Sequence, residues 1–158
     1  MRFRLAFILL LIVGYAAAAE DAYFTPLTPL PAEKATVYIY RPAAEFNDAG
    51  YPHIFVNGEK QKFRLKNGRY AVLTLLPAEY EIKAQGSRFG TNWWPGPTTR
   101  TVTVEAGREY YVRVLPVLPP GVQPGLHLFK KNNVSRTTMT LVPKEQALMD
   151  ISATKLAK

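Results

Sequence analysis

Apolar and polar residues alternate along most of the chain, and Gly, Pro, Asn and Asp interrupt the alternation at short intervals. Successive side chains of a strand point to opposite faces, so this period of two predicts strands with one buried face. The first is ATVYIYRP, residues 35–42, which is rich in β-branched and aromatic residues and stops at a proline. The same pattern predicts strands at 53–56, 59–65, 69–76, 79–85, around 101–105, and at 109–117, 125–131 and 136–143.

Short strands at this spacing, without helices between them, predict an all-β fold. We expect an antiparallel β-sandwich of the immunoglobulin or transthyretin-like kind. Only the last residues have helical spacing, with Ala147, Leu148 and Ile151 on one side and Pro143 suited to the first turn. The expected organisation is a signal peptide at 1–19, an extended proline-rich leader at 20–34, a β-sandwich at 35–142 and a helix at 143–158.

The predicted strand 59–65 follows an Asn57-Gly58 pair, which is the strongest short signal for a two-residue hairpin turn. Its alternation places Phe63 and Leu65 inward. The opposite face carries four cations about 7 Å apart along an extended chain, namely Lys60, Lys62, Arg64 and Lys66. They are candidates for binding an anionic surface. The alternative is a solvated face, or a row of lysines that protects a sheet edge from pairing.

Residues 1–19 have the parts of a secretory signal peptide. Arg2 and Arg4 precede the apolar stretch 5–16, and three alanines follow. We expect cleavage after Ala19 and export, which places the mature protein in the periplasm or outside the cell. The alternative is an uncleaved anchor, although the apolar run is shorter than the about 20 residues that a spanning helix needs. No cysteine follows that could carry a lipid.

The composition narrows the classes of function. The chain has no cysteine, which excludes disulfides, cysteine nucleophiles and thiolate metal sites. Its formal net charge is +8, and without Arg2 and Arg4 the remaining 18 basic and 12 acidic residues leave +6 for the mature form. This charge favours approach to anionic surfaces, or simply keeps the protein soluble.

Residues that would indicate an enzyme are scarce. The two histidines, His53 and His127, are far apart and have no neighbour at ligand spacing, so the sequence predicts no metal site. No serine lies in a Gly-x-Ser-x-Gly motif, and there is no phosphate-binding loop. We therefore expect no catalytic residue, no cofactor and no enzyme activity. A hydrolase whose site the sequence does not reveal is the less favoured alternative.

The two tryptophans of the chain, Trp93 and Trp94, are adjacent and precede a Pro-Gly-Pro turn. In an extended segment they point to opposite sides, so we expect one ring in the core and one at the surface. A surface tryptophan on a rigid loop is a good anchor for a protein partner or a sugar. With the flanking Arg88 and Arg100, they form a candidate partner-binding loop. The alternative is that both rings cap the end of the sandwich.

Three segments, in this order, are similar to a known family. They are ATVYIYRP, then HIFVNGEK with LKNGRYAVLTLLPAEYEIKA, then TVTVEAGREYYVRV. Together with the C-terminal PKEQAL, they resemble the bacterial envelope family termed domain of unknown function 2846, over roughly residues 35–150. The resemblance implies a small secreted or envelope β-sandwich. It implies no activity and no catalytic residue.

The sequence thus predicts a non-catalytic binding or interaction module of the bacterial envelope. The partners we expect are an envelope protein, a glycan or an anionic membrane surface, and not a nucleic acid. The alternative is a structural accessory domain that pairs with an envelope partner through its sheet edges or through the leader 20–34. Once the signal peptide is removed, we expect no integral membrane segment.

Overall fold

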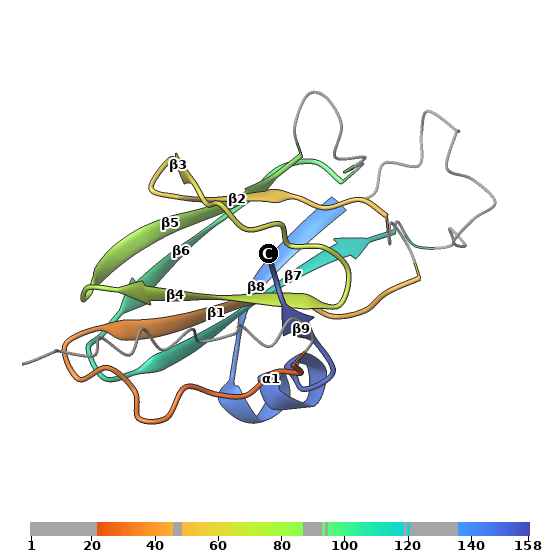
Figure 1. Cartoon of the computed structure of the whole chain (residues 1–158). Coiled ribbons are helices and arrows are strands. Elements are labelled where there is room, and N and C mark those ends of the chain that lie inside the picture. Colours follow the sequence, from red (N-terminus) through yellow and green to blue (C-terminus); the bar gives the residue numbers. More distant parts are fainter. Residues whose placement is uncertain (1–21, 46–48, 87–92, 94, 119, 121–135) are drawn as a thin grey trace, which may run out of the picture.

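Strand β1, Ala35–Arg41, lies at the centre of the larger of two sheets, and all of its residues are buried. The computed structural model describes residues 22–45, 49–86, 93, 95–118, 120 and 136–158. β1 pairs with β4, Arg69–Leu75, in antiparallel register and with β7, Glu109–Val117, in parallel register. β8, Arg136–Val142, and β9, Lys155–Leu156, complete this sheet in the order β8-β7-β1-β4-β9 (Figure 1).

The second sheet is antiparallel and has the strand order β3-β2-β5-β6. Its strands are β2, His53–Val56, β3, Glu59–Lys60, β5, Ala78–Gln85, and β6, Thr98–Val104. The predicted turn between β2 and β3 is present, since Asn57 has φ 48° and Gly58 has φ 81°, the positive values that a type I′ turn requires. The two sheets pack face to face (Figure 1), so the predicted all-β sandwich is confirmed.

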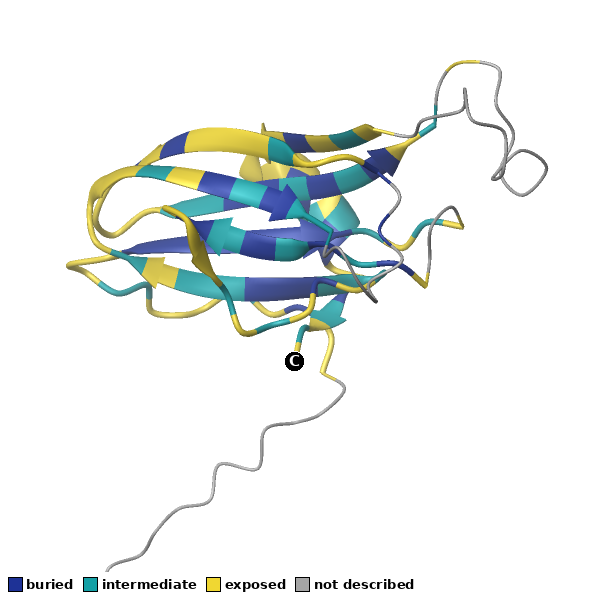
Figure 2. Ribbon diagram, turned by 90° about the horizontal axis from the view of Figure 1, so that it is seen from above, coloured by how far each residue is buried: buried dark blue, intermediate teal, exposed yellow. Residues whose placement is uncertain are grey.

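The main apolar core lies between the two sheets. Along β2, β5 and β6, buried residues alternate with less buried ones, as the period of two predicts, and Figure 2 shows such bands of burial on the strands. On β6, Val102 and Val104 are buried while Thr101 and Thr103 are exposed. The buried members of this core are Ala35, Val37, Ile39, Ile54, Leu65, Ile82, Ala84, Val102, Val104, Val112, Val114 and Met139.

The outer face of the larger sheet is also covered, which is why β1 is buried on both sides. Helix α1, Lys144–Ile151, packs Ala147 and Ile151 against this face (Figure 1). Beside the helix, Phe24 of the leader fills the same layer. The tyrosine cluster, as we term this second core, consists of Phe24, Tyr38, Tyr40, Tyr70, Tyr111, Val142, Ala147 and Ile151.

Two predicted elements differ from the structure. The predicted strand 59–65 ends at Lys60, where the chain leaves the smaller sheet and crosses to β4 of the larger one. The predicted helix 143–158 ends at Ile151, and β9 follows it. The cause is the open edge of β4, where the carbonyl oxygens of Gly68, just before the strand, and Tyr70 accept hydrogen bonds from Lys155 N and Ala157 N. The predicted strand 125–131 and the signal peptide lie outside the described residues.

The leader is joined to the domain by backbone hydrogen bonds. Phe24 N donates to the Thr154 carbonyl oxygen at 2.9 Å, and Leu27 N donates to the Tyr38 hydroxyl at 2.7 Å. Tyr23 forms an isolated bridge with β9. Phe24 is buried, whereas Tyr23 and Leu27 are exposed. No helix in the described ranges is long and apolar enough to cross a membrane.

Candidate functional site

The basic segment, as we term residues 60–66, connects the two sheets and carries the four predicted cations. All four, Lys60, Lys62, Arg64 and Lys66, are exposed. Between them, Phe63 is half-buried and Leu65 is fully buried, and both pack against the core between the sheets. The alternation of exposed cations and buried apolar residues is therefore confirmed, although most of the segment is not a strand.

Backbone hydrogen bonds fix the basic segment at both ends. Gln61 N donates to the Ile54 carbonyl oxygen at 2.8 Å, and Arg64 N donates to the Lys158 carbonyl oxygen at the same distance. Lys66 N in turn donates to the Arg64 carbonyl oxygen at 2.8 Å. Because the backbone is already ordered, binding through these side chains costs little additional backbone entropy.

No Asp or Glu side chain forms an ion pair with the basic segment within the described part of the chain. The ion pairs found there join Arg108 to Glu105, Arg113 to Asp150 and Lys144 to Glu109. Burial lowers the pKa of His53, and the charges of Lys60 and Arg64 lower it further. At neutral pH, His53 is therefore uncharged while the basic segment is positive.

The structure adds cations that the sequence analysis missed. Arg69 of β4 and Lys155 of β9 are partners in the parallel pairing of these strands. The hydrogen bond between Arg64 and Lys158 brings the end of β9 next to the basic segment. Lys155 Nζ lies 5.2 Å from the centroid of the Tyr23 ring, which places the leader beside the same cations. Only long-range pairing brings these residues together, so no local pattern could have shown them.

Trp93 belongs to the core at one end of the sandwich. Its side chain is only 9% exposed, and the guanidinium carbon of Arg41 lies 5.0 Å from the ring centroid. Arg41 is fully buried at the end of β1 and donates a hydrogen bond from Nη1 to the Gly50 carbonyl oxygen. A desolvated guanidinium over an indole is a favourable cation–π pair. Trp93 therefore stabilises the end of the sandwich and is not an exposed binding residue.

The predicted partner-binding loop is only partly described. Trp94 and Arg88 lie outside the described residues. Trp93 lies in the core, and whether Trp94 is the expected surface ring stays a prediction. Arg100 is exposed on β6, where it pairs with Ile82 of β5. The described residues therefore do not bring the loop candidates together into one site.

The contact between Trp93 and Gly86 gives a testable prediction. A Cβ atom at Gly86 would lie 2.9 Å from the Trp93 Cβ and 3.1 Å from the Trp93 carbonyl oxygen. We expect Gly86→Ala to displace the indole and to lower the free energy of unfolding by about 1–3 kcal/mol, a usual effect of overpacking. In a Trp94→Phe background, the emission of Trp93 should shift to longer wavelength and become quenchable by acrylamide.

Gly96→Ala is the matched control for this substitution, because a Cβ atom at Gly96 would meet nothing within 4 Å. It should leave the emission of Trp93 unchanged. Equal emission spectra for the two variants would contradict the tight packing of Trp93 against Gly86.

Potential metal ligands are not clustered in the part of the chain that the structure describes. It holds no group of three or more His, Cys, Asp and Glu residues that could bind a metal ion. Of the two histidines, His53 is half-buried on β2 and His127 lies outside the described residues. The basic segment is therefore the candidate site that the described geometry supports best.

Comparison with known proteins identifies the family but not a relative of known function. A family model described as "Protein of unknown function (DUF2846)" matches residues 31–124. Among the curated proteins and the solved structures, none matches the chain. The matched range includes β1 to β7, and with them the basic segment and most of the core between the sheets. Because this match covers more than half of the sequence and runs through both sheets, the chain belongs to the DUF2846 family.

Proposed function

We propose that the protein is an exported, non-catalytic module that binds the anionic surface of a membrane through its basic segment. The observation that carries the proposal is the arrangement of Lys60, Lys62, Arg64 and Lys66. All four are exposed, their backbone is held by hydrogen bonds, and no ion pair among the described residues includes them.

The energy available from this arrangement is sufficient for reversible binding. A lysine or arginine near an anionic lipid surface contributes about 1 kcal/mol. Four such side chains therefore supply roughly 4 kcal/mol, and Arg69 and Lys155 lie close enough to add to the field. Because the cations remain hydrated at the surface, this binding avoids the large desolvation cost of a buried ion pair.

The position of the leader supports an orientation in which the basic segment faces the membrane. Tyr23 lies against Lys155, so the chain joins the domain beside the basic segment. In the sequence, the predicted cleavage after Ala19 is only a few residues before Tyr23. While the signal peptide still holds the chain at the membrane, this position would keep the cations next to the membrane surface. An uncleaved anchor would hold the same face there permanently.

Vesicle co-sedimentation tests the proposal. We expect residues 20–158, which contain every described strand and helix, to sediment with vesicles of phosphatidylglycerol and phosphatidylethanolamine but not with phosphatidylcholine vesicles. Replacing all four cations of the basic segment by glutamine should weaken this binding by at least tenfold, and by up to roughly several hundredfold at low salt. Raising the ionic strength should also weaken the binding of the unmodified protein to anionic vesicles.

A second variant removes the same number of charges from elsewhere on the surface. It replaces Lys34, Arg100, Arg108 and Arg136, all exposed and none of them in the basic segment, by glutamine. Both variants have the same net charge, so only a local site distinguishes them. Equal weakening in the two variants would show that net charge alone drives binding, and the proposed site would be wrong. A purified acidic polysaccharide that binds when vesicles do not would assign the basic segment to a glycan instead.

The alternative of a structural accessory domain keeps both of its candidate surfaces, although one residue of the leader is withdrawn, since Tyr23 and Leu27 stay exposed and Phe24 does not. The leader cannot readily pair with a partner protein through Phe24, because this residue is buried in the tyrosine cluster of its own domain. The sheet edges stay available for that alternative, although no described feature identifies a partner for them.

A further inference from the structure

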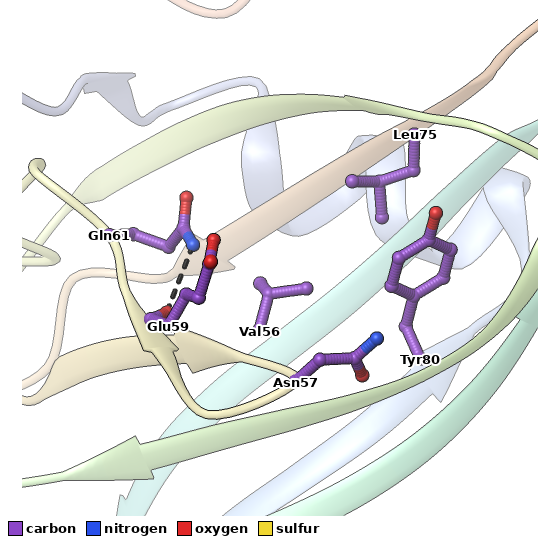
Figure 3. A pocket seen from close by; sticks show the side chains of 6 residues that line it. All are labelled: Val56, Asn57, Glu59, Gln61, Leu75 and Tyr80. Carbon is purple, nitrogen blue, oxygen red and sulfur yellow. Dashed lines mark hydrogen bonds between the residues drawn. The ribbon is translucent and has the colours of Figure 1, made fainter.

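A pocket opens between the two sheets at the hairpin formed by β2 and β3. Its volume is about 420 Å³, within the range of small-molecule sites in proteins. Figure 3 shows Glu59 and Gln61 on one side and Tyr80 on the other, with Val56 between them. Leu75 reaches the pocket from β4 of the opposite sheet (Figure 3). The six lining residues are Val56, Asn57, Glu59, Gln61, Leu75 and Tyr80.

The pocket combines an apolar wall with polar groups of both hydrogen-bonding kinds. Val56, Leu75 and the ring of Tyr80 supply the apolar surface. Asn57 Oδ1 already accepts a hydrogen bond from Glu81 N at 2.8 Å, so its amide group Nδ2 keeps two N–H donors for a ligand. Asn57 is held in this position by its own backbone, since its N–H donates to the Glu81 carbonyl oxygen at 2.9 Å.

Two acceptors of the pocket, on Gln61 and Glu59, lie on the opposite side from Tyr80. Gln61 Nε2 donates to the Glu59 carbonyl oxygen at 3.0 Å. The side-chain oxygen of Gln61 can therefore accept a hydrogen bond from a ligand. The Glu59 carboxylate takes part in no ion pair within the described residues. Tyr80 donates its hydroxyl proton to the Leu76 carbonyl oxygen at 3.1 Å, so its oxygen can only accept further hydrogen bonds.

These groups select one class of ligand. A purely apolar ligand would bury the amide of Asn57 and the carboxylate of Glu59 without partners, which is costly. A small anion would meet the carboxylate of Glu59 at close range and be repelled. Hydroxyl groups both donate and accept, so neighbouring hydroxyls can satisfy the Asn57 donors and the Gln61 and Glu59 acceptors together. The C–H face of a sugar ring packs well against an aromatic and aliphatic wall.

We propose that this pocket binds the pyranose ring of an uncharged saccharide, with Tyr80, Val56 and Leu75 against the ring face and Asn57, Gln61 and Glu59 bound to its hydroxyls. The pocket is distinct from the cations of the basic segment, although Gln61 lies between two of them in sequence. Saccharide binding is therefore independent of the proposed membrane function, and either can fail without the other.

Nuclear magnetic resonance titration of the ¹⁵N-labelled chain from residue 20 tests the proposal. The probes are maltotriose, cellotriose and triacetylchitotriose. We expect at least one of them to produce saturable shifts of the amide signals of Asn57, Gln61 and Tyr80. Signals of the basic segment beyond Gln61 should move less, and a salt concentration that abolishes vesicle binding should leave these shifts unchanged.

Asn57→Asp is the sharpest variant, because it keeps the side-chain oxygen that the fold uses, removes both donors and adds one negative charge that an uncharged saccharide does not sense directly. Aspartate also tolerates the positive φ of 48° and keeps an oxygen for the N–H of Glu81. We expect saccharide affinity to fall by roughly tenfold or more, since a buried hydroxyl loses its partner. Gln61→Met, which keeps the side-chain length but removes the acceptor, should also weaken saccharide binding.

Lys62→Gln is the control, since Lys62 is exposed and does not line the pocket. It should bind the saccharide as the unmodified protein does. The proposal is wrong if none of the probes gives saturable shifts at the pocket up to its solubility limit. It is equally wrong if Asn57→Asp and Gln61→Met, with thermal unfolding unchanged, bind a probe as tightly as Lys62→Gln.

Discussion

Replacing Phe24 by alanine is expected to lower the free energy of unfolding by about 3–5 kcal/mol, the range seen for large aromatic residues in protein cores. The ring centroid of Phe24 lies 5.1 Å from those of Tyr38 and Tyr70 and 6.5 Å from that of Tyr111, each time edge to face. Such aromatic pairs contribute beyond their buried area. The leader is thus a structural part of the domain, which its composition alone did not show.

Urea unfolding followed by circular dichroism measures this effect. Tyr23→Ala is the matched control, because Tyr23 is the preceding aromatic residue and its side chain is 60% exposed. We expect a loss within about 1 kcal/mol for Tyr23→Ala, since exposed positions contribute little. Similar losses for the two variants, or no loss for Phe24→Ala, would show that the leader does not dock as described.

Raising the pH from about 10 to about 12 is expected to remove several kcal/mol of stability, because the tyrosine cluster resists ionisation. Burial, followed by the negative charge of Asp150 against the opposing effect of Arg113, raises the pKa of Tyr40 to about 12. Burial is also the main cause of the raised pKa values of Tyr38, Tyr70 and Tyr111.

The sign of this effect follows from the unfolded state. An unfolded chain releases a tyrosine proton near pH 10, whereas folded Tyr40 keeps it to about pH 12. Between these values the unfolded state binds fewer protons, so stability is complete below about pH 10 and falls as the pH rises. Tyr40, which is fully buried, accounts for roughly 2–3 kcal/mol of that loss, and the other three tyrosines add to it.

Chemical unfolding at about pH 9 and about pH 11.5 tests this expectation, with Tyr40→Phe as the diagnostic variant. The Tyr40 hydroxyl makes no hydrogen bond of normal geometry within the described part of the chain, although the Asp150 carboxylate lies near enough to raise its pKa, so its removal should cost little at pH 9. The loss of stability between the two pH values should be smaller in Tyr40→Phe than in the unmodified protein. An unchanged loss would mean that Tyr40 does not contribute to the alkaline instability.

The strands that the sequence predicted well are those with both a period of two and clear turn residues. β2 begins and ends where predicted because Asn57-Gly58 defines its end, and β7 has the predicted bounds because it alternates for its whole length. β9 was missed, since two residues contain no period and are a strand only through pairing with β4. The parallel pairing of β1 with β7 was likewise outside the reach of local patterns.

The residues of the candidate site could be predicted from the sequence, but not the structural element that carries them. The alternation of Phe63 and Leu65 with cations correctly indicated which side chains are exposed. It did not require a sheet, because a chain that crosses between two sheets also buries every second residue. The burial of Trp93 depends on Arg41 at the end of β1, a cation that no sequence rule places inside a core.

The contacts between the leader and β9 also determine the order in which the domain can assemble. Tyr23 and Phe24 bind residues 154 and 155, and Arg64 binds residue 158. If the chain is exported as proposed, with residue 20 crossing the membrane before the C-terminal residues, the leader and the basic segment lack these partners until almost all of the chain has arrived. Contacts between residues so distant in sequence form slowly. We expect these contacts between the two ends of the chain to form in the final step of folding. Until then, the tyrosine cluster should be accessible to proteases and chaperones.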